Sequence, residues 1–289
     1  DAECAFWNEQ GQAGLSSRIW PTRNWQPDEV AQNAALRTTD VAQPAIGAVS
    51  LGLYRVLGQF GIQGDLFAGH SFGELTALAA SGRLSETDFH QLANFRGRLM
   101  AQAGGSDAGS MVAVALPLQE LDHFVADNCP RLVVANRNAP KQAVLSGSDI
   151  AIEDAIRILD QRGIRSQKLP VAAAFHSPEV AAATTPFLEV LQKARFHAST
   201  APVLANSTGL KYPDEQEAAR TLLAHQIARP VLFFDMVEEM VRLGATTFLE
   251  VGPGQVLTGL VRQILDEYSP HSVALACDTG KKDGSDLAR

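Results

Sequence analysis

The sequence predicts an α/β fold, with a mostly parallel, hydrolase-like sheet core and an inserted ferredoxin-like α+β subdomain. Three observations lead to this prediction. Strand-like and helix-like stretches alternate over most of the chain, as expected for a parallel sheet. Residues 67–82 run from an apolar stretch through two glycines into a helix-prone stretch, which is typical of a strand that turns directly into a helix. Residues 111–171 follow the order β-α-β-β-α-β, which is the ferredoxin-like arrangement.

The predicted large subdomain comprises residues 1–110 and 172–289, on either side of the small subdomain at 111–171. Residues 1–40, which hold three tryptophans and two prolines, are expected to be irregular. The elements expected after them are helices at 44–60, 74–80, 179–193 and 215–243, a helix opened by a capping box at 85–88, a short helix after 252–254, and strands at 202–206, 246–251 and 273–277.

The small subdomain is predicted from six short stretches of alternating type. Alternating apolar and polar residues predict strands, and longer amphipathic stretches predict helices. The expected elements are strands at 111–116, 131–135, 142–146 and 164–171, helices at 118–127 and 150–161, and a turn at 138–140.

The composition favours a cytoplasmic protein with a sizeable core. The chain has 289 residues, 46% of them hydrophobic, and a net charge of −8, which argues against binding to nucleic acid. Its apolar runs are far shorter than the ~18 residues of a membrane span, and its polar start does not resemble a signal peptide. The three cysteines are widely spaced, so neither a disulfide framework nor a metal site is expected. The absent start methionine and the polar end suggest a domain of a longer polypeptide.

The stretch Gly69-His70-Ser71-Phe72-Gly73 indicates a nucleophile elbow. A strand that turns straight into a helix holds its corner residue near strained φ/ψ angles, and glycines two positions before and after relieve the crowding. The corner side chain of Ser71 then stands clear of the sheet, and the N–H of Phe72 points to the space in front of it. A glycine-rich turn without chemistry is the alternative, because this short pattern is common by chance.

A serine nucleophile needs a base within hydrogen-bond reach, and His176 is the best candidate among the seven histidines. It follows the apolar run 171–175 and begins a turn, a place where functional residues concentrate. His70 is adjacent to Ser71 and cannot easily face its hydroxyl. The aspartates within 149–160 lie on helix faces of the small subdomain and none stands out, so an uncharged acceptor is a further way to orient His176.

Arg96 interrupts the apolar stripe of the helix that follows the elbow helix. The stripe consists of Phe89, Leu92, Ala93, Leu99 and Met100. A buried guanidinium is costly unless it is paired. Its partner is either an internal carboxylate in a structural salt bridge or the carboxylate of a ligand, which arginine binds through two parallel hydrogen bonds.

These residues, together with several later segments, resemble the malonyl-CoA:acyl carrier protein transacylase family over about 41–277. Residues 19–21 and 42–47 are most similar to acyltransferase domains of iterative synthases, with enediyne-type polyketide synthases first and polyunsaturated fatty acid synthases close behind. The matching segments are Val41-Ala42-Gln43-Pro44-Ala45, Gly69-His70-Ser71-Phe72-Gly73-Glu74, Phe95-Arg96-Gly97-Arg98-Leu99-Met100, Asn138-Ala139-Pro140, Val144-Leu145-Ser146-Gly147, Phe175-His176, Gln226 ahead of Arg229-Pro230-Val231, and Glu250-Val251-Gly252-Pro253-Gly254.

The resemblance implies an acyltransferase that moves malonyl from malonyl-CoA to the phosphopantetheine thiol of an acyl carrier protein, beside other domains of a synthase and without a bound cofactor or metal. It implies that Ser71 is the nucleophile and His176 the base. A main-chain carbonyl at Gln226 would orient His176, and Arg96 would bind the malonyl carboxylate.

The resemblance also implies an acyl pocket formed by His70, Phe175 and Asn138. In the family, phenylalanine before the histidine accompanies malonyl rather than methylmalonyl, because the ring fills the space of an α-methyl group. The oxyanion hole would consist of the N–H of Phe72 and a donor at Gln12, although no apolar strand precedes Gln12 as it does in the family. The alternatives are a lipase-like or patatin-like serine hydrolase and a catalytically idle docking domain.

Overall fold

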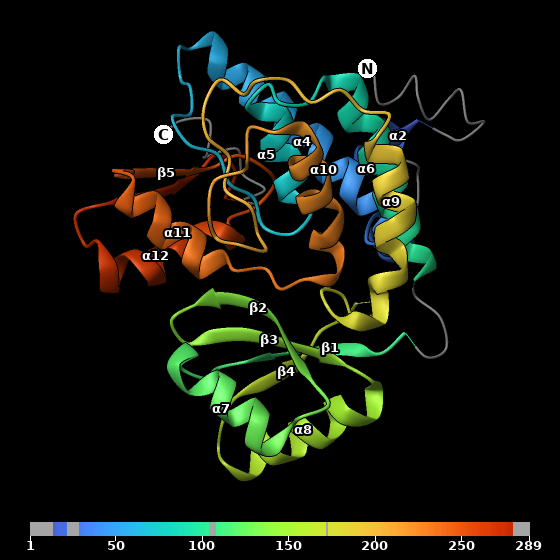
Figure 1. The fold of residues 1–289 in the computed structure, drawn as a ribbon, viewed down its shortest axis with the longest axis vertical. Coiled ribbons are helices and arrows are strands. Elements are labelled where there is room, and N and C mark those ends of the chain that lie inside the picture. Colours follow the sequence, from blue (N-terminus) through green and yellow to red (C-terminus); the bar gives the residue numbers. More distant parts are fainter. Residues whose placement is uncertain (1–13, 22–28, 104–107, 172, 280–289) are drawn as a thin grey trace.

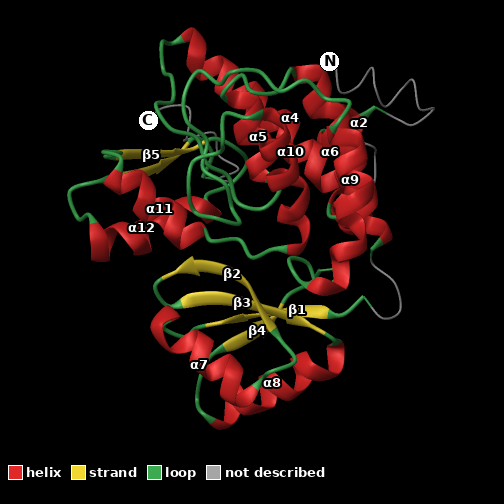
Figure 2. Ribbon diagram, viewed as in Figure 1, coloured by secondary structure: helices red, strands yellow, loops and turns green. Residues whose placement is uncertain are grey.

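The computed structural model describes residues 14–21, 29–103, 108–171 and 173–279. Within them the chain forms a large part and a small part, and Figure 1 shows the small part below the large one. Figure 2 shows that helices dominate the large part, whereas the small part is a sheet covered by two helices. The domain division at 111–171 stays a prediction, and the limits of the small sheet at Ser110 and Lys168 support it.

The small part has the chain order and strand order of the predicted ferredoxin-like arrangement. Its pairings are all antiparallel and its strand order is β2-β3-β1-β4. Residues 138 and 139, expected in a turn, lie in β2, because two register shifts allow this strand to continue as far as the turn at Pro140-Lys141. The elements are β1 (Ser110–Val114), α7 (Leu118–Asn128), β2 (Val133–Ala139), β3 (Gln142–Gly147), α8 (Asp149–Gln161) and β4 (Ser166–Lys168).

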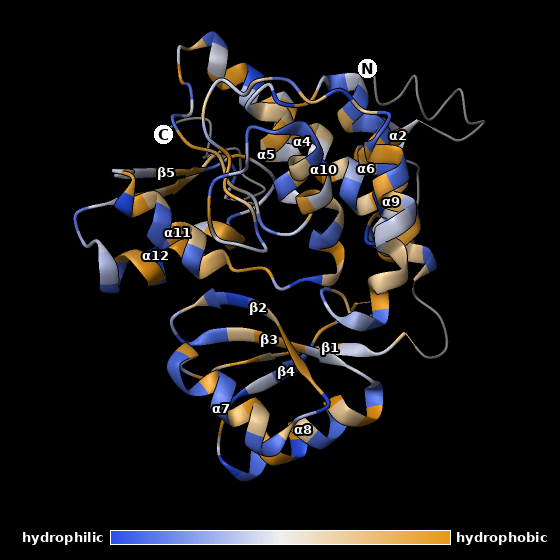
Figure 3. Ribbon diagram, in the orientation of Figure 1, coloured by the Kyte–Doolittle hydropathy of each residue, from blue (hydrophilic) through white to orange (hydrophobic). Residues whose placement is uncertain are grey.

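The small sheet lies between two apolar layers, because side chains alternate across each strand. Val112 and Leu145 pack in one cluster with Ile152 of α8. Met111 and Val144, on the other face, belong to the core of the large part. Figure 3 shows hydrophobic and hydrophilic segments alternating along α7 and α8, as expected for helices that bury one side.

The large part begins with helices that the sequence did not predict. Of the stretch 1–40 that is expected to be irregular, the described residues 15–19 and 29–36 are helical. Leu15 of the first helix packs against Val41 and Ala45 in a separate apolar cluster, and Leu36 of the second lies against the same cluster. The expected helix at 179–193 starts as a 3₁₀ turn. The elements are α2 (Leu15–Ile19), α3 (Glu29–Leu36), α4 (Thr39–Gln59), α5 (Gly73–Ala80), α6 (Glu86–Gln102), η1 (Pro178–Ala183), α9 (Thr184–Leu191), α10 (Gln216–His225), η2 (Gln226–Ala228), α11 (Phe233–Arg242), β5 (Thr247–Glu250), α12 (Val256–Tyr268) and β6 (Val273–Ala276).

Parallel pairing in the large part is present but short. β5 and β6 form a two-stranded parallel sheet, and the strand expected before the elbow pairs with 202–206 only at one parallel bridge, Phe67–Val203. The ladder stops there because side chains take the next backbone groups. The carbonyl of Gly69 accepts a hydrogen bond from the side chain of Asn206. The main-chain N–H of Asn206 donates to the carboxylate of Glu74.

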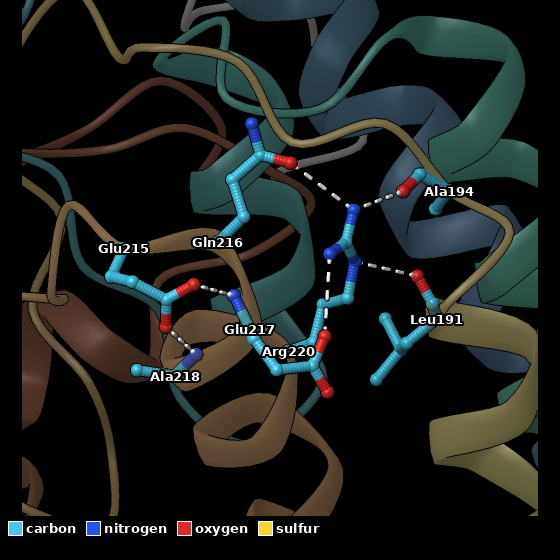
Figure 4. Close-up of polar contacts among 7 residues, drawn as sticks. All are labelled: Leu191, Ala194, Glu215, Gln216, Glu217, Ala218 and Arg220. Atoms are coloured by element: carbon cyan, nitrogen blue, oxygen red, sulfur yellow. Dashed lines mark hydrogen bonds and ion pairs between the residues drawn. The ribbon is translucent and has the colours of Figure 1, made fainter.

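Helix α10 is fixed at its start, which positions the turn η2 at its end. The Glu215 carboxylate accepts hydrogen bonds from two amides of the first turn, a cap that favours helix formation. Figure 4 shows Arg220 of α10 reaching the end of α9, where it donates to the carbonyls of Leu191 at 3.1 Å and Ala194 at 3.0 Å. Gln226 follows directly after this anchored helix.

Candidate active site

Ser71 occupies a strained corner between the bridge at Phe67 and α5. Its φ angle is 51°, and apart from glycines only His176, at 58°, shares a positive φ among the described residues, a conformation that is uncommon for residues with a side chain. A Cβ on Gly69 would lie 2.0 Å from the backbone of Gly73, so glycine is required there as predicted. A Cβ on Gly73 would meet nothing within 4 Å. The expected crowding at Gly73 is therefore wrong, because this first residue of α5 faces open space.

His176 contacts the Ser71 hydroxyl directly. Its Nε2 lies 2.8 Å from Ser71 Oγ, and its Nδ1 lies 3.1 Å from the main-chain carbonyls of both Gln226 and Arg229. A carbonyl only accepts hydrogen bonds, so Nδ1 carries the proton and Nε2 is left to accept from the serine. The strand expected at 164–171 is shorter in the structure, where β4 ends at Lys168, and residues 175–176 form a turn.

The surroundings of His176 favour the neutral imidazole. The side chain is buried, and burial lowers its pKa to about 3, with further lowering by the charges of Arg96 and His70. Asp149 and Asp154 of the small part do not fill this role, because they form ion pairs with side chains of Lys168, Arg131 and Arg157. Among the described residues, the hydrogen bonds of His176 Nδ1 therefore go to neutral acceptors.

Arg96 reaches the same serine from α6. Its Nη1 donates to Gln43 Oε1 at 2.7 Å, its Nη2 donates to Gln226 Oε1 at 3.1 Å, and Nη2 lies 3.5 Å from Ser71 Oγ. The residue is 1% exposed, and burial lowers its pKa to about 10. No ion pair joins it to a carboxylate among the described residues, although the buried Glu74 acts on it electrostatically. An internal salt bridge therefore does not account for this buried cation.

A second layer of buried polar side chains, which sequence reasoning did not identify, surrounds the elbow. Asn206 accepts from the Ser71 N–H at 2.6 Å and donates to the Gly69 carbonyl at 2.6 Å. Glu74 accepts from the Asn206 amide at 3.2 Å and from the Tyr212 hydroxyl, and burial raises its pKa to about 7. The signal for Asn206 was its place as a polar residue at the end of an apolar run, the same signal that selected His176.

The remaining predicted site residues lie around this centre. No described residue accepts a hydrogen bond from the Phe72 N–H, and the Phe72 ring lies 5.9 Å from the Arg96 guanidinium carbon. His70 turns toward the small part, where its Nε2 lies 2.8 Å from Asn138 Oδ1, and burial lowers its pKa. Phe175 precedes His176 and is 9% exposed.

Three sequence-based expectations, on the second oxyanion donor, on metal binding and on membrane spans, depend on which residues the structure describes. Gln12, the expected second oxyanion donor, lies outside them. Within them, no cluster of three or more histidine, cysteine or acidic side chains is arranged to bind a metal ion. None of the helices within those ranges is both long and apolar enough to cross a bilayer.

A serine, a histidine and a buried cation that meet at one point of an α/β fold are typical of enzymes that transfer acyl groups through a serine. The acyl transferase domain family matches residues 18–289, and the chain belongs to this family. A polyunsaturated fatty acid synthase protein of Thraustochytrium sp. is 31% identical over 280 residues, or 94% of this chain and 10% of that protein. Malonyl CoA-acyl carrier protein transacylase of Bacillus subtilis is 31% identical over 259 residues, or 86% of this chain and 81% of that protein.

The predicted fold class is also confirmed by solved structures. The acyltransferase domain of an iterative polyketide synthase in enediyne biosynthesis matches with a TM-score of 0.76 and 29% identity, over 87% of this chain and 64% of that one. The predicted family resemblance is likewise confirmed. The chain spans only about a tenth of the length of the large synthases that it matches.

Proposed function

We propose that this chain transfers malonyl from malonyl-CoA to the phosphopantetheine thiol of an acyl carrier protein, through an ester on Ser71. The observation that carries the proposal is the position of Arg96, a buried cation without a carboxylate partner among the described residues, 3.5 Å from the Ser71 hydroxyl. The malonyl group ends in a free carboxylate, which a guanidinium binds through two parallel hydrogen bonds. An acetyl group has no such anion.

In the first half of the reaction, His176 Nε2 takes the proton of Ser71 while Oγ attacks the thioester carbon. The Phe72 N–H stabilises the oxyanion, a contribution of roughly 3–4 kcal/mol in comparable sites. The C–S bond then breaks, the CoA sulfur takes the proton from His176, and the malonyl ester remains on Ser71.

In the second half, the carrier thiol gives its proton to His176 and attacks the ester. The C–O bond to Ser71 breaks, and Oγ recovers its proton from His176. The main-chain carbonyls on Nδ1 hold the imidazole throughout, and no bound cofactor or metal takes part in these steps.

Neither a serine hydrolase nor an idle docking domain explains all the features of this site. A lipase-like or patatin-like hydrolase would use Ser71 and His176 but would not need a buried Arg96 that has no carboxylate partner among the described residues. An idle docking domain would need neither the strained Ser71 nor its base. The buried Phe175 supports malonyl over methylmalonyl, because its ring takes the space of an α-methyl group, and His70 with Asn138 completes the proposed pocket.

The setting that we propose is a multidomain synthase of polyketide or fatty acid biosynthesis in the cytoplasm. The similarity to large synthases and to an enediyne acyltransferase domain supports this setting. An enediyne-type parent is the narrower proposal. The described cysteines, Cys129 and Cys277, are free thiols, in keeping with a reducing compartment.

Intact-protein mass spectrometry after exposure to malonyl-CoA tests this function. Wild-type protein should gain one malonyl group, Ser71→Ala should gain none, and a carrier protein bearing phosphopantetheine should remove the label. Rapid release of malonate to water without a carrier would favour the hydrolase. Absence of any label would favour the docking domain.

A further inference from the structure

The main chain of Ser71 is held on both sides by buried side chains that the mechanism above does not use. Its N–H donates to Asn206 Oδ1 at 2.6 Å, and its carbonyl accepts from Gln226 Nε2 at 2.8 Å. The same carbonyl also accepts a hydrogen bond from the main-chain N–H of Glu74, in the first turn of α5, at 3.1 Å. Asn206 and Gln226 are 0% exposed, and Gln226 Nε2 also lies 3.3 Å from Asn206 Oδ1.

The hydrogen bonds of Asn206 and Gln226 stabilise the strained backbone of Ser71. The φ angle of Ser71, 51°, is sparsely populated by residues with a side chain, and such a conformation persists only where the surroundings over-determine it. Asn206 bridges the turn by bonding both Ser71 N–H and the Gly69 carbonyl. Gln226 holds the other side of the same residue.

The carbonyl that Gln226 holds belongs to the peptide bond whose N–H is that of Phe72. A trans peptide is planar, so its C=O and N–H point in opposite directions, and the described chain has no cis peptide. The direction of the Ser71 carbonyl therefore sets the direction of the Phe72 N–H. No described residue accepts from that N–H.

We propose that the side chain of Gln226 is a positioning residue that aims the Phe72 N–H at the developing oxyanion. This role is separate from that of its main-chain carbonyl, which holds His176 Nδ1 at 3.1 Å. The inference rests on the proposed function, because an oxyanion forms only if Ser71 attacks a carbonyl. Substitution of Gln226 removes its side chain and keeps the main-chain carbonyl, so the two roles can be tested apart.

Besides the Ser71 carbonyl, the Gln226 side chain contacts Asn206 and Arg96, and the test must separate the effect on Arg96. Gln226 Oε1 accepts from Arg96 Nη2 at 3.1 Å, and Gln43 Oε1 accepts from Arg96 Nη1 at 2.7 Å. Gln43 has no hydrogen bond to Ser71 among the described residues. Gln43→Ala is therefore the matched control for Gln226→Ala, because both remove one acceptor from Arg96 and only the latter releases the Ser71 carbonyl.

The experiment measures kcat and KM with malonyl-CoA and with acetyl-CoA, together with Tm. Both variants should lose part of the preference for malonyl. Only Gln226→Ala should lower kcat with both acyl groups, by about 10- to 100-fold, somewhat less than removal of an oxyanion donor outright. The KM for acetyl-CoA should stay within about threefold, because the lost interaction belongs to the transition state.

Gln226→Glu gives a second readout if Gln226→Ala is poorly folded. Beside the Arg96 cation the new carboxyl group should be ionised. The ionised group keeps an oxygen for Arg96 but cannot donate to the Ser71 carbonyl, so kcat with acetyl-CoA should again fall. The proposal is wrong if this variant keeps the wild-type kcat, or if folded Gln226→Ala matches Gln43→Ala with acetyl-CoA. Failure of the wild type to form a malonyl ester would instead overturn the proposed function.

Discussion

Replacement of Arg96 by alanine should sharply reduce the preference for malonyl over acetyl groups. Arg96 is 1% exposed, and its hydrogen bonds to side chains other than Ser71 go to neutral oxygens of Gln43 and Gln226. Burial lowers its pKa to about 10, so it still carries a positive charge at neutral pH. Among the described residues no carboxylate hydrogen-bonds to this cation, so the wild-type site keeps a place for an anionic acyl group.

The size of the effect follows from the contact that is lost. A hydrogen bond to a charged group contributes about 1.5–3 kcal/mol, so the ratio of malonyl to acetyl kcat/KM should fall roughly 10- to 150-fold. Acetyl transfer should be kept or improved, because acetyl leaves the cation of the wild type unpaired.

The assay is the rate of acyl-enzyme formation with each thioester, measured beside a thermal melt. Arg96→Lys is the matched control, since it keeps the charge but loses the planar pair of donors, and it should fall between wild type and alanine. Equal loss of both activities in a destabilised Arg96→Ala protein would refute the reasoning, because a purely structural arginine would behave in that way.

Other predictions follow from the same contacts. His176→Ala should slow acylation by about 10²–10⁴-fold in the same rate assay; a smaller loss would argue against a general base. Because burial lowers the pKa of His176 to about 3, wild-type acylation should hold as pH falls through the ordinary histidine range, whereas Arg96→Ala, which removes a charge that lowers this pKa, should lose rate at a higher pH. His176 has a pKa near 6.5 in the unfolded chain and about 3 in the folded protein, so between these values only the unfolded chain binds a proton there. The free energy of unfolding should therefore decrease as pH falls from 6.5 toward about 3, which denaturant titration can measure. Gly69→Ala should abolish labelling by malonyl-CoA, since its Cβ would lie 2.0 Å from backbone, while Gly73→Ala, with nothing within 4 Å, should stay folded by thermal melt; the reverse order would contradict the elbow geometry. Phe175→Ser should raise methylmalonyl transfer relative to malonyl in a competition assay, and an unchanged ratio would remove Phe175 from the pocket.

Features that depend on a few neighbouring residues could be predicted from the sequence. The elbow at Ser71 follows from local backbone sterics, because only glycine fits at position 69. The capping box could also be predicted from the sequence. Ser85 is the N-cap of α6, and its Oγ accepts a hydrogen bond from the main-chain N–H of Asp88 at 3.1 Å. The order of elements in the small part came from local periodicity in the same way.

The partners of these residues were decided by tertiary structure. Helical periodicity showed that Arg96 must be buried, but not that its acceptors would be Gln43, 53 positions away, and Gln226, 130 positions away. The orientation of His176 depends on carbonyls 50 and 53 positions further along the chain. A local pattern reveals that a polar side chain is buried and must be satisfied. Which group satisfies it depends on elements that come together only when the chain packs. For this reason the partners of Asn206 and of the Gln226 side chain could be identified only in the folded protein.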